Sequence, residues 1–116
     1  MPIQNVLGGF ERPILTVSAA RTLGLNDANT FLLCTGATAF TVTVPADATT
    51  NFEIGTEFDI TQDGTGAITI AAATGVSIFR IGSTATTGHI LMGQYAVAML
   101  KKISANSWRI YGGVSY

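Results

Sequence analysis

Acidic and hydroxyl side chains in one stretch have a spacing that could bind a metal ion. Asp59, Thr61 and Asp63 lie two residues apart and precede a glycine, as at the start of a calcium-binding EF-hand loop. Such a loop also needs a bidentate glutamate at its twelfth position and a helix on either side. The twelfth position is Ile70, and the flanking residues alternate as strands do. We therefore interpret the stretch as a plain turn and expect no metal site.

Glu57 and Asp59 are the second candidate for chemistry. Two residues apart on a strand, they point to the same face about 7 Å from each other. A pair of carboxylates at about that separation can hydrolyse glycosidic bonds when it lies in a cleft lined by aromatic side chains. Nothing in the sequence places an aromatic residue beside them on that face, on which Thr61 continues the row. We expect an exposed strand face.

Nucleophilic catalysis also has little support in the sequence. His89 is the only histidine, so a triad would have to combine it with a serine or with Cys34, and no Gly-x-Ser-x-Gly elbow occurs. Cys34 follows three apolar residues and is expected to be buried as a small hydrophobic side chain. Gly64-Thr65-Gly66 lacks the third glycine of a dinucleotide-binding loop. These observations predict a protein that is not an enzyme and has no cofactor.

The chain from Ile54 to Ile78 is the clearest structural element that carries these residues. Apolar and polar residues alternate on both sides of Asp63-Gly64-Thr65-Gly66, whose glycines suit the positive φ angles of a tight reversal. This pattern predicts a hairpin with one buried face, followed by a third strand after Gly75.

Short strand-like segments continue along the rest of the chain at roughly ten-residue spacing, which is typical of an antiparallel sandwich or barrel. Outside the hairpin they are Ile14–Ser18, Phe31–Cys34, Phe40–Val44, Gly88–Met92, Tyr95–Lys101 and Trp108–Tyr111. We predict one all-β domain over residues 13–116, an antiparallel, jelly-roll-like β-sandwich, preceded by an N-terminal arm of residues 1–12. The residues expected to point inward are Phe31, Leu33, Val42, Val44, Phe58, Ile60, Ile68, Ile70, Val97 and Met99. Phe40–Val44 and Ala67–Ile70 look alike, but two matches do not establish a repeat.

The composition limits the possible partners. Charged residues make up 11% of the 116 residues, against about 25% in a usual soluble protein. Threonine, with 17 residues, supplies much of the polarity and suits a solvated strand face. A surface with so little charge favours an oligomer or a protein bound to a lattice. The net charge of −1 disfavours nucleic acid and anionic membranes as partners. No membrane span or signal peptide is recognisable, so we expect synthesis in a cytoplasm.

Residues 1–12 do not fit the pattern of the domain that follows. Ile3, Val6, Leu7 and Phe10 make this arm too apolar for a solvated tail, and a pair of glycines interrupts it. We predict that these four residues are the partner-binding site of the protein.

From Ile14 to Gly112 the chain resembles a β-rich module that recurs in virion proteins of tailed bacteriophages. The residues that carry the resemblance are, in order, Arg21-Thr22-Leu23, Asn26-Asp27-Ala28-Asn29, Phe40-Thr41-Val42-Thr43-Val44-Pro45, Phe52, Ile54-Gly55, Phe58, Ile60, Gln62, Gly64, Gly66-Ala67-Ile68-Thr69-Ile70, Gly75-Val76, Ile78, Gly93-Gln94-Tyr95, Leu100, Lys102 and Trp108. Each motif alone is simple, and the resemblance rests on their order.

The resemblance implies a structural role in a virion that is assembled in the host cytoplasm. Proteins with this module include capsid decoration proteins, tail-associated adhesins and fibre tips, and they commonly form trimers. A single small domain with an apolar arm favours a capsid decoration (cement) protein, a homotrimer that binds the major capsid protein or another virion protein. The alternative is a receptor-binding tail-fibre tip, in which Tyr111 and Tyr116 could stack on sugars. We expect Trp108 and Tyr111 to be core or interface residues instead.

Overall fold

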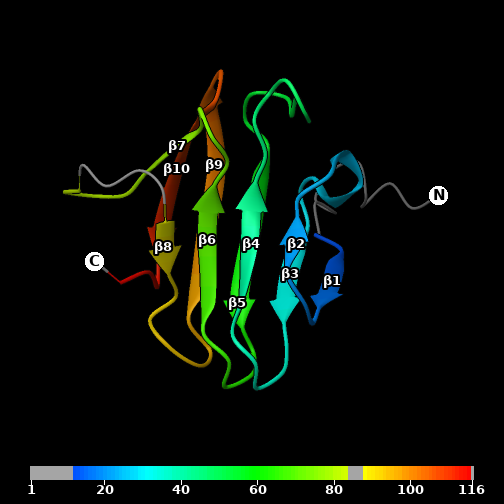
Figure 1. The fold of residues 1–116 in the computed structure, drawn as a ribbon, viewed down its shortest axis with the longest axis vertical. Coiled ribbons are helices and arrows are strands. Elements are labelled where there is room, and N and C mark those ends of the chain that lie inside the picture. Colours follow the sequence, from blue (N-terminus) through cyan, green and yellow to red (C-terminus); the bar gives the residue numbers. More distant parts are fainter. Residues whose placement is uncertain (1–11, 84–87, 116) are drawn as a thin grey trace, which may run out of the picture.

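The computed structural model describes residues 12–83 and 88–115, in which ten strands form two sheets. The six-stranded sheet has the order β1 (Ile14–Val17), β3 (Phe31–Cys34), β5 (Glu57–Gln62), β9 (Val97–Ser104), β10 (Ser107–Gly112), β7 (Ser77–Phe79). The four-stranded sheet has the order β2 (Arg21–Thr22), β4 (Phe40–Val44), β6 (Ile68–Ala72), β8 (Gly88–Ile90), and η1 (Leu25–Asp27) is a short 3-10 turn. Figure 1 shows the four-stranded sheet in front of β5 and β9. The all-β prediction is confirmed.

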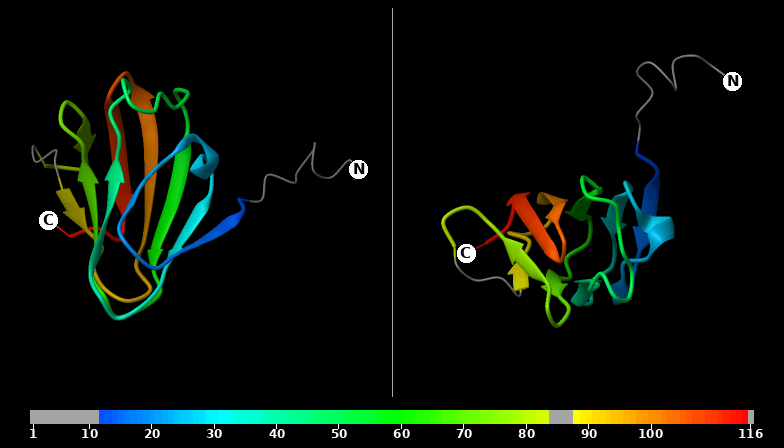
Figure 2. Two further views of the ribbon diagram at one scale, coloured as in Figure 1. Left: turned by 45° about the vertical axis from the view of Figure 1, so that its right-hand side comes forward. Right: turned by 90° about the horizontal axis from the view of Figure 1, so that it is seen from above.

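The chain passes from one sheet to the other after almost every strand. From β1 to β8 the odd-numbered strands belong to the six-stranded sheet and the even-numbered strands to the four-stranded sheet. Neighbours within each sheet therefore come from successive windings and run parallel, as β1–β3–β5 and β2–β4–β6 do. Figure 2 shows the two layers that result. Three pairs of strands are antiparallel: β6 with β8, β5 with β9, and β9 with β10. β7 pairs with β10 in parallel.

The predicted hairpin between β5 and β6 is therefore wrong, and so is antiparallel pairing among the first six strands. The turn at residues 63–67 does not reverse the chain within a sheet but carries it across to the other sheet. It lies on the preceding turn: the amide of Gly66 donates to the Gly36 carbonyl at 3.0 Å. A Cβ on Gly64 would come within 2.1 Å of the same oxygen. Neither Gly64 nor Gly66 has a positive φ, so close approach requires these two glycines.

Two successive windings have the same length. Phe31 pairs with Asp59 in one sheet and Phe40 with Ile68 in the other, an offset of 28 residues in both ladders. The similarity of Phe40–Val44 to Ala67–Ile70 thus belongs to two adjacent, in-register parallel strands.

The hydrophobic core lies between the two sheets. Phe58 is fully buried on β5, and its ring contacts that of Phe52 edge-on, with 5.4 Å between the ring centroids. Trp108 on β10 completes an aromatic cluster, 5.8 Å from Phe52. The predicted inward orientation is confirmed for Val42, Val44, Phe58, Ile60, Ile68 and Ile70.

The predicted orientation is wrong for four residues on two strands. On β3 the buried residues are Leu32 and Cys34, while Phe31 and Leu33 point outward. All four residues of this strand are apolar, so alternation could not distinguish its faces. On β9 the buried residues are Ala98 and Leu100, while Val97 and Met99 point outward. The core side of β9 faces large residues across the ladder, because Ala98 pairs with Ile60 and Leu100 with Phe58.

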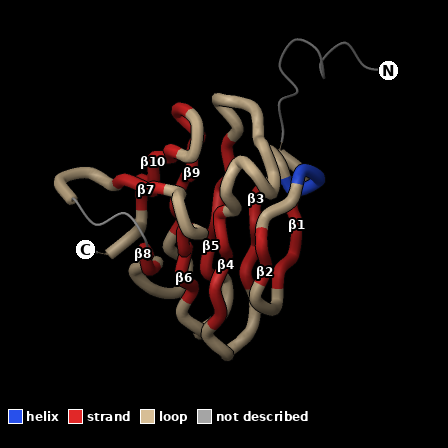
Figure 3. Tube along the Cα trace, turned by 45° about the horizontal axis from the view of Figure 1, so that its top comes forward, coloured by secondary structure: helices blue, strands red, loops and turns tan. Residues whose placement is uncertain are grey.

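Figure 3 shows that strands and loops make up nearly all of the described chain. Within residues 12–83 and 88–115, no helix has the length and apolarity that crossing a membrane requires.

Candidate functional site

The outer surfaces of the two sheets differ in chemistry. The outward side chains of β4 and β6 include Thr41, Thr43 and Thr69, which suit contact with water. We call this surface the four-strand face. The outward side chains of the six-stranded sheet, which we call the six-strand face, are mainly apolar and aromatic apart from its charged centre. They include Ile14, Phe31, Leu33, Glu57, Asp59, Val97, Met99, Lys101, Ile103, Arg109, Tyr111 and Phe79, together with the polar residues Thr16, Thr61 and Ser77.

Ion pairs occupy the centre of the six-strand face. Arg12 reaches across β3 to Glu57 and also lies 3.3 Å from the Asp59 carboxylate. Lys101 on the neighbouring strand β9 lies 3.3 Å from Glu57. Partial burial raises the pKa of Glu57, but the hydrogen bonds and charges of Lys101 and Arg12 outweigh it and lower the pKa overall. Glu57 and Asp59 share a face as predicted, but they are ion-paired and only partly exposed, not on an open strand face.

One end of the six-strand face is hollowed where β7, β9 and β10 meet. The hollow, of about 390 Å³, is lined by the apolar side chains of Phe79, Ile81, Ile103 and Tyr111. The guanidinium of Arg109 lies 5.1 Å from the centre of the Phe79 ring, a cation–π contact. Among the described residues Arg109 has no carboxylate partner. Within the part of the chain that the structure describes, the hollow therefore combines apolar side chains with a guanidinium that has no carboxylate partner.

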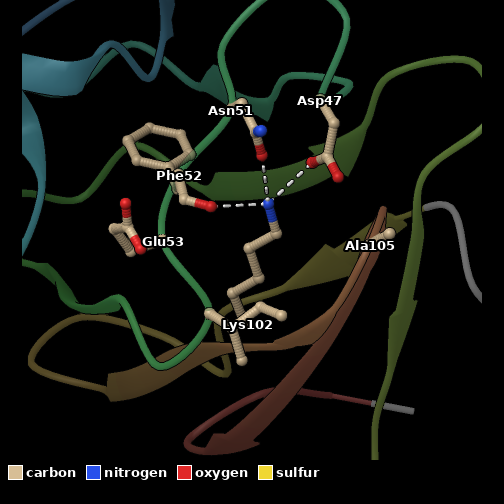
Figure 4. Close-up of a pocket in the computed structure, with 7 residues that line it drawn as sticks. Asp47, Asn51, Phe52, Glu53, Lys102 and Ala105 are labelled. Atoms are coloured by element: carbon tan, nitrogen blue, oxygen red, sulfur yellow. Dashed lines mark hydrogen bonds and ion pairs between the residues drawn. The ribbon is translucent and has the colours of Figure 1, made fainter.

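A second hollow, of about 350 Å³, surrounds the buried Lys102 (Figure 4). The Lys102 ammonium is 1% exposed and donates to Asp47 at 2.8 Å, to Asn51 at 3.1 Å and to the Phe52 carbonyl at 2.7 Å. The other carboxylate oxygen of Asp47 accepts from the backbone amide of Asn106. An ammonium has three donors, and all three are used. These hydrogen bonds hold the loop that follows β4 against β9 and β10. They leave no N–H donor of Lys102 free for a ligand.

Three further residues considered for chemistry, Cys34, His89 and Thr61, are buried, whereas Asp63 is exposed. Burial raises the pKa of the Cys34 thiol to about 11, and its side chain is 1% exposed, so the prediction of an inert core cysteine is confirmed. His89 is equally buried and its Nε2 lies 2.7 Å from the Ile78 carbonyl oxygen, to which it donates. The Thr61 hydroxyl donates to the Ala96 carbonyl at 3.0 Å. Among the described residues, no three His, Cys, Asp or Glu side chains gather as a metal site.

Several of the residues that carry the resemblance stabilise the fold. Arg21 donates to both carboxylate oxygens of the buried Asp27, which also accepts from the amide of Gly24. Burial raises the pKa of Asp27, but these hydrogen bonds outweigh it and lower the pKa overall. Asn29 has a positive φ of 60° and accepts the amide of Glu57 through its side chain. Trp108 is a core residue, as expected.

The predicted partner-binding residues Ile3, Val6, Leu7 and Phe10 lie outside the described residues. The structure adds a surface that the predicted core residues do not include: Phe31, Leu33, Val97 and Met99 lie on it. A signal for it existed in the chain: Glu57 and Asp59 point outward, and the strands beside them must present their outward residues on the same face.

Comparison with models of protein families and with curated protein sequences found no match.

Proposed function

We propose that this chain is a non-enzymatic structural protein of a bacteriophage virion, a capsid decoration (cement) protein that binds and stabilises the head shell. The observation that supports this proposal best is the six-strand face, an apolar surface on a protein with few charges. Large exposed apolar patches are typical of surfaces that bind other proteins. The order of the motifs shared with the phage module supports the same role.

The proposed protein is a homotrimer that contacts the major capsid protein or another virion protein through residues 1–10. Burial of Ile3, Val6, Leu7 and Phe10 contributes about 6–12 kcal/mol. Ordering ten residues costs about 10–20 kcal/mol of backbone entropy. Apolar burial alone is therefore insufficient, and the arm needs backbone hydrogen bonds, most simply as a strand added to another sheet. Three arms on one trimer strengthen binding through effective concentration.

A test compares the full chain with a variant that lacks residues 1–9. Both proteins should fold and melt alike, because the core lies between the two sheets. The full chain should co-sediment with phage heads, and the shortened chain should not. Imaging labelled virions should show many copies over the head. Undiminished binding of the shortened chain would reject the role of the arm, and labelling only at the tail would reject the decoration role.

Tail-only labelling would favour the second candidate, a receptor-binding module at a fibre tip. The hollow beside Tyr111 favours this candidate, because a half-exposed aromatic ring and the Arg109 guanidinium could bind an acidic sugar. We place it second, since the apolar surface extends well beyond the hollow.

A further inference from the structure

The two outer faces of this chain provide an internal comparison. On the four-strand face, the outward positions of β4 and β6 carry Thr41, Thr43 and Thr69, and Ile90 on the edge strand β8 is the exposed apolar exception. On the six-strand face, the corresponding outward positions carry large apolar side chains: Val97 is 44% exposed and Tyr111 46% exposed. Antiparallel or mixed sheets can leave one face in water, and that face is then polar. The six-strand face therefore has the composition of a covered surface.

The charges at the centre of the six-strand face allow contact with another copy of the chain. Arg12 and Lys101 neutralise Glu57 and Asp59 within the chain, so the centre of the face has no net charge. Two copies can approach one another there without like-charge repulsion, which opposes contact between identical charged surfaces.

The size of the face fits a small contact. Six strands about 4.8 Å apart and about five residues long at 3.4 Å each give a plane of roughly 500 Å², which side-chain relief increases. In a ring of three copies the two contacts of each copy share this area, so each contact is smaller than the ~800 Å² that each partner buries in a standard interface and should dissociate on dilution.

We infer that the six-strand face is the contact surface between copies of this chain; this inference rests on the self-association in the proposed function. The six-strand face has two apolar flanks, one on either side of its charged centre. Phe31 and Leu33 on β3 form one flank, while Met99 and Tyr111 on β9 and β10 form the other. A ring of three copies needs two different patches on each copy, and these flanks supply them.

Oxidative labelling at two protein concentrations tests this surface without any substitution. Met99 and Tyr111 should react several-fold more slowly in the concentrated protein than after about a hundredfold dilution, because dilution separates the copies by mass action. Met92 and Tyr95 are matched controls of the same residue types. They are 70% and 71% exposed in the segment between β8 and β9, so their reaction should not change with concentration.

Substitutions provide the second measurement. Val97→Glu combined with Tyr111→Glu should weaken self-association at least tenfold by light scattering, since both carboxylates would be buried in the contact. Thr43→Glu combined with Thr69→Glu adds the same charge to the four-strand face and should leave the oligomer intact. Both variants alter outward positions, and thermal melting verifies that each is folded.

Three outcomes would overturn the inference. One is a full-length protein of 12.1 kDa in solution whose Met99 and Tyr111 react equally at both concentrations. Another is protection of Met99 that is independent of concentration and disappears when residues 1–11 are deleted, which assigns the face to the chain's own first residues. The third is protection that appears only with purified phage heads, which assigns it to a capsid protein. Binding to heads is measured separately. A protein that binds heads but does not self-associate through the six-strand face would therefore reject this inference and leave the proposed function standing.

Discussion

At the scale of single residues, Lys102 has the most demanding environment in the described chain. A buried ammonium loses its hydration, and only close acceptors restore the free energy that this costs. Asp47, Asn51 and the Phe52 carbonyl provide these acceptors from one loop. The side chain therefore stabilises the loop after β4 instead of serving a reaction.

This arrangement predicts a large effect of removing the counter-charge. Asp47→Ala should lower the free energy of unfolding by about 3–5 kcal/mol, because the Lys102 charge remains buried without its carboxylate. Glu53→Ala is the matched control: Glu53 lines the same hollow but is exposed, so its loss should cost less than about 0.5 kcal/mol. Chemical denaturation measures both values. An Asp47→Ala protein as stable as the wild type would mean that water replaces the carboxylate.

Single residues also mark the limit of inference from the sequence. Phe58 and Ile60 were placed in the core correctly, because polar residues separate them on β5. On β9, Ala98 has too small a side chain to indicate a buried face, and Val97 and Met99 beside it are larger. What decides the orientation is the cross-strand partner, Ile60, which lies far away in the sequence. Local alternation carries no information about that partner.

At the scale of elements, the turns determine the topology. The turn at residues 35–39 lies against the turn at residues 63–67, with the Gly64 amide directed at the Cys34 carbonyl at 3.3 Å. This stacking keeps β3 beside β5 and β4 beside β6 in the same register. The existence of most strands could be predicted from their composition. The pairing could not, because a glycine-rich turn is compatible both with a hairpin and with a crossing between sheets.

The stacked turns predict that Gly64 is required because its backbone lies against that of Gly36, and not because of its φ angle. Gly64→Ala should destabilise the protein by about 1–3 kcal/mol or more, because the added methyl group would meet the backbone of Gly36. Gly24→Ala is the control, since a Cβ at Gly24 meets nothing within 4 Å and its φ of −117° suits any residue. Thermal unfolding of the two variants measures the difference. Equal melting temperatures would show that the two turns can separate freely.

At the scale of the whole molecule, the strands at the end of the sheets and those in the middle differ in how many neighbours they pair with. β1 and β2 are the outermost strands of the first winding, and each pairs on one side only. β5 and β9 lie in the middle of the six-stranded sheet and pair on both sides, with Phe58 and Leu100 fully buried between the layers. Local opening requires less free energy where fewer contacts are broken.

Native-state hydrogen exchange should therefore differ between these two groups of strands. Amides of β5 and β9 should exchange only through global unfolding, whereas those of β1 and β2 should exchange through local opening at lower denaturant concentration. The experiment belongs at a concentration where the chain is monomeric, since contact between copies would protect β1 as well. β7, the other outermost strand of the six-stranded sheet, is the internal control, because it too pairs on one side and should open locally. Equal protection of β1 and β9 in the monomer would contradict this gradient and show that the windings unfold as one cooperative unit.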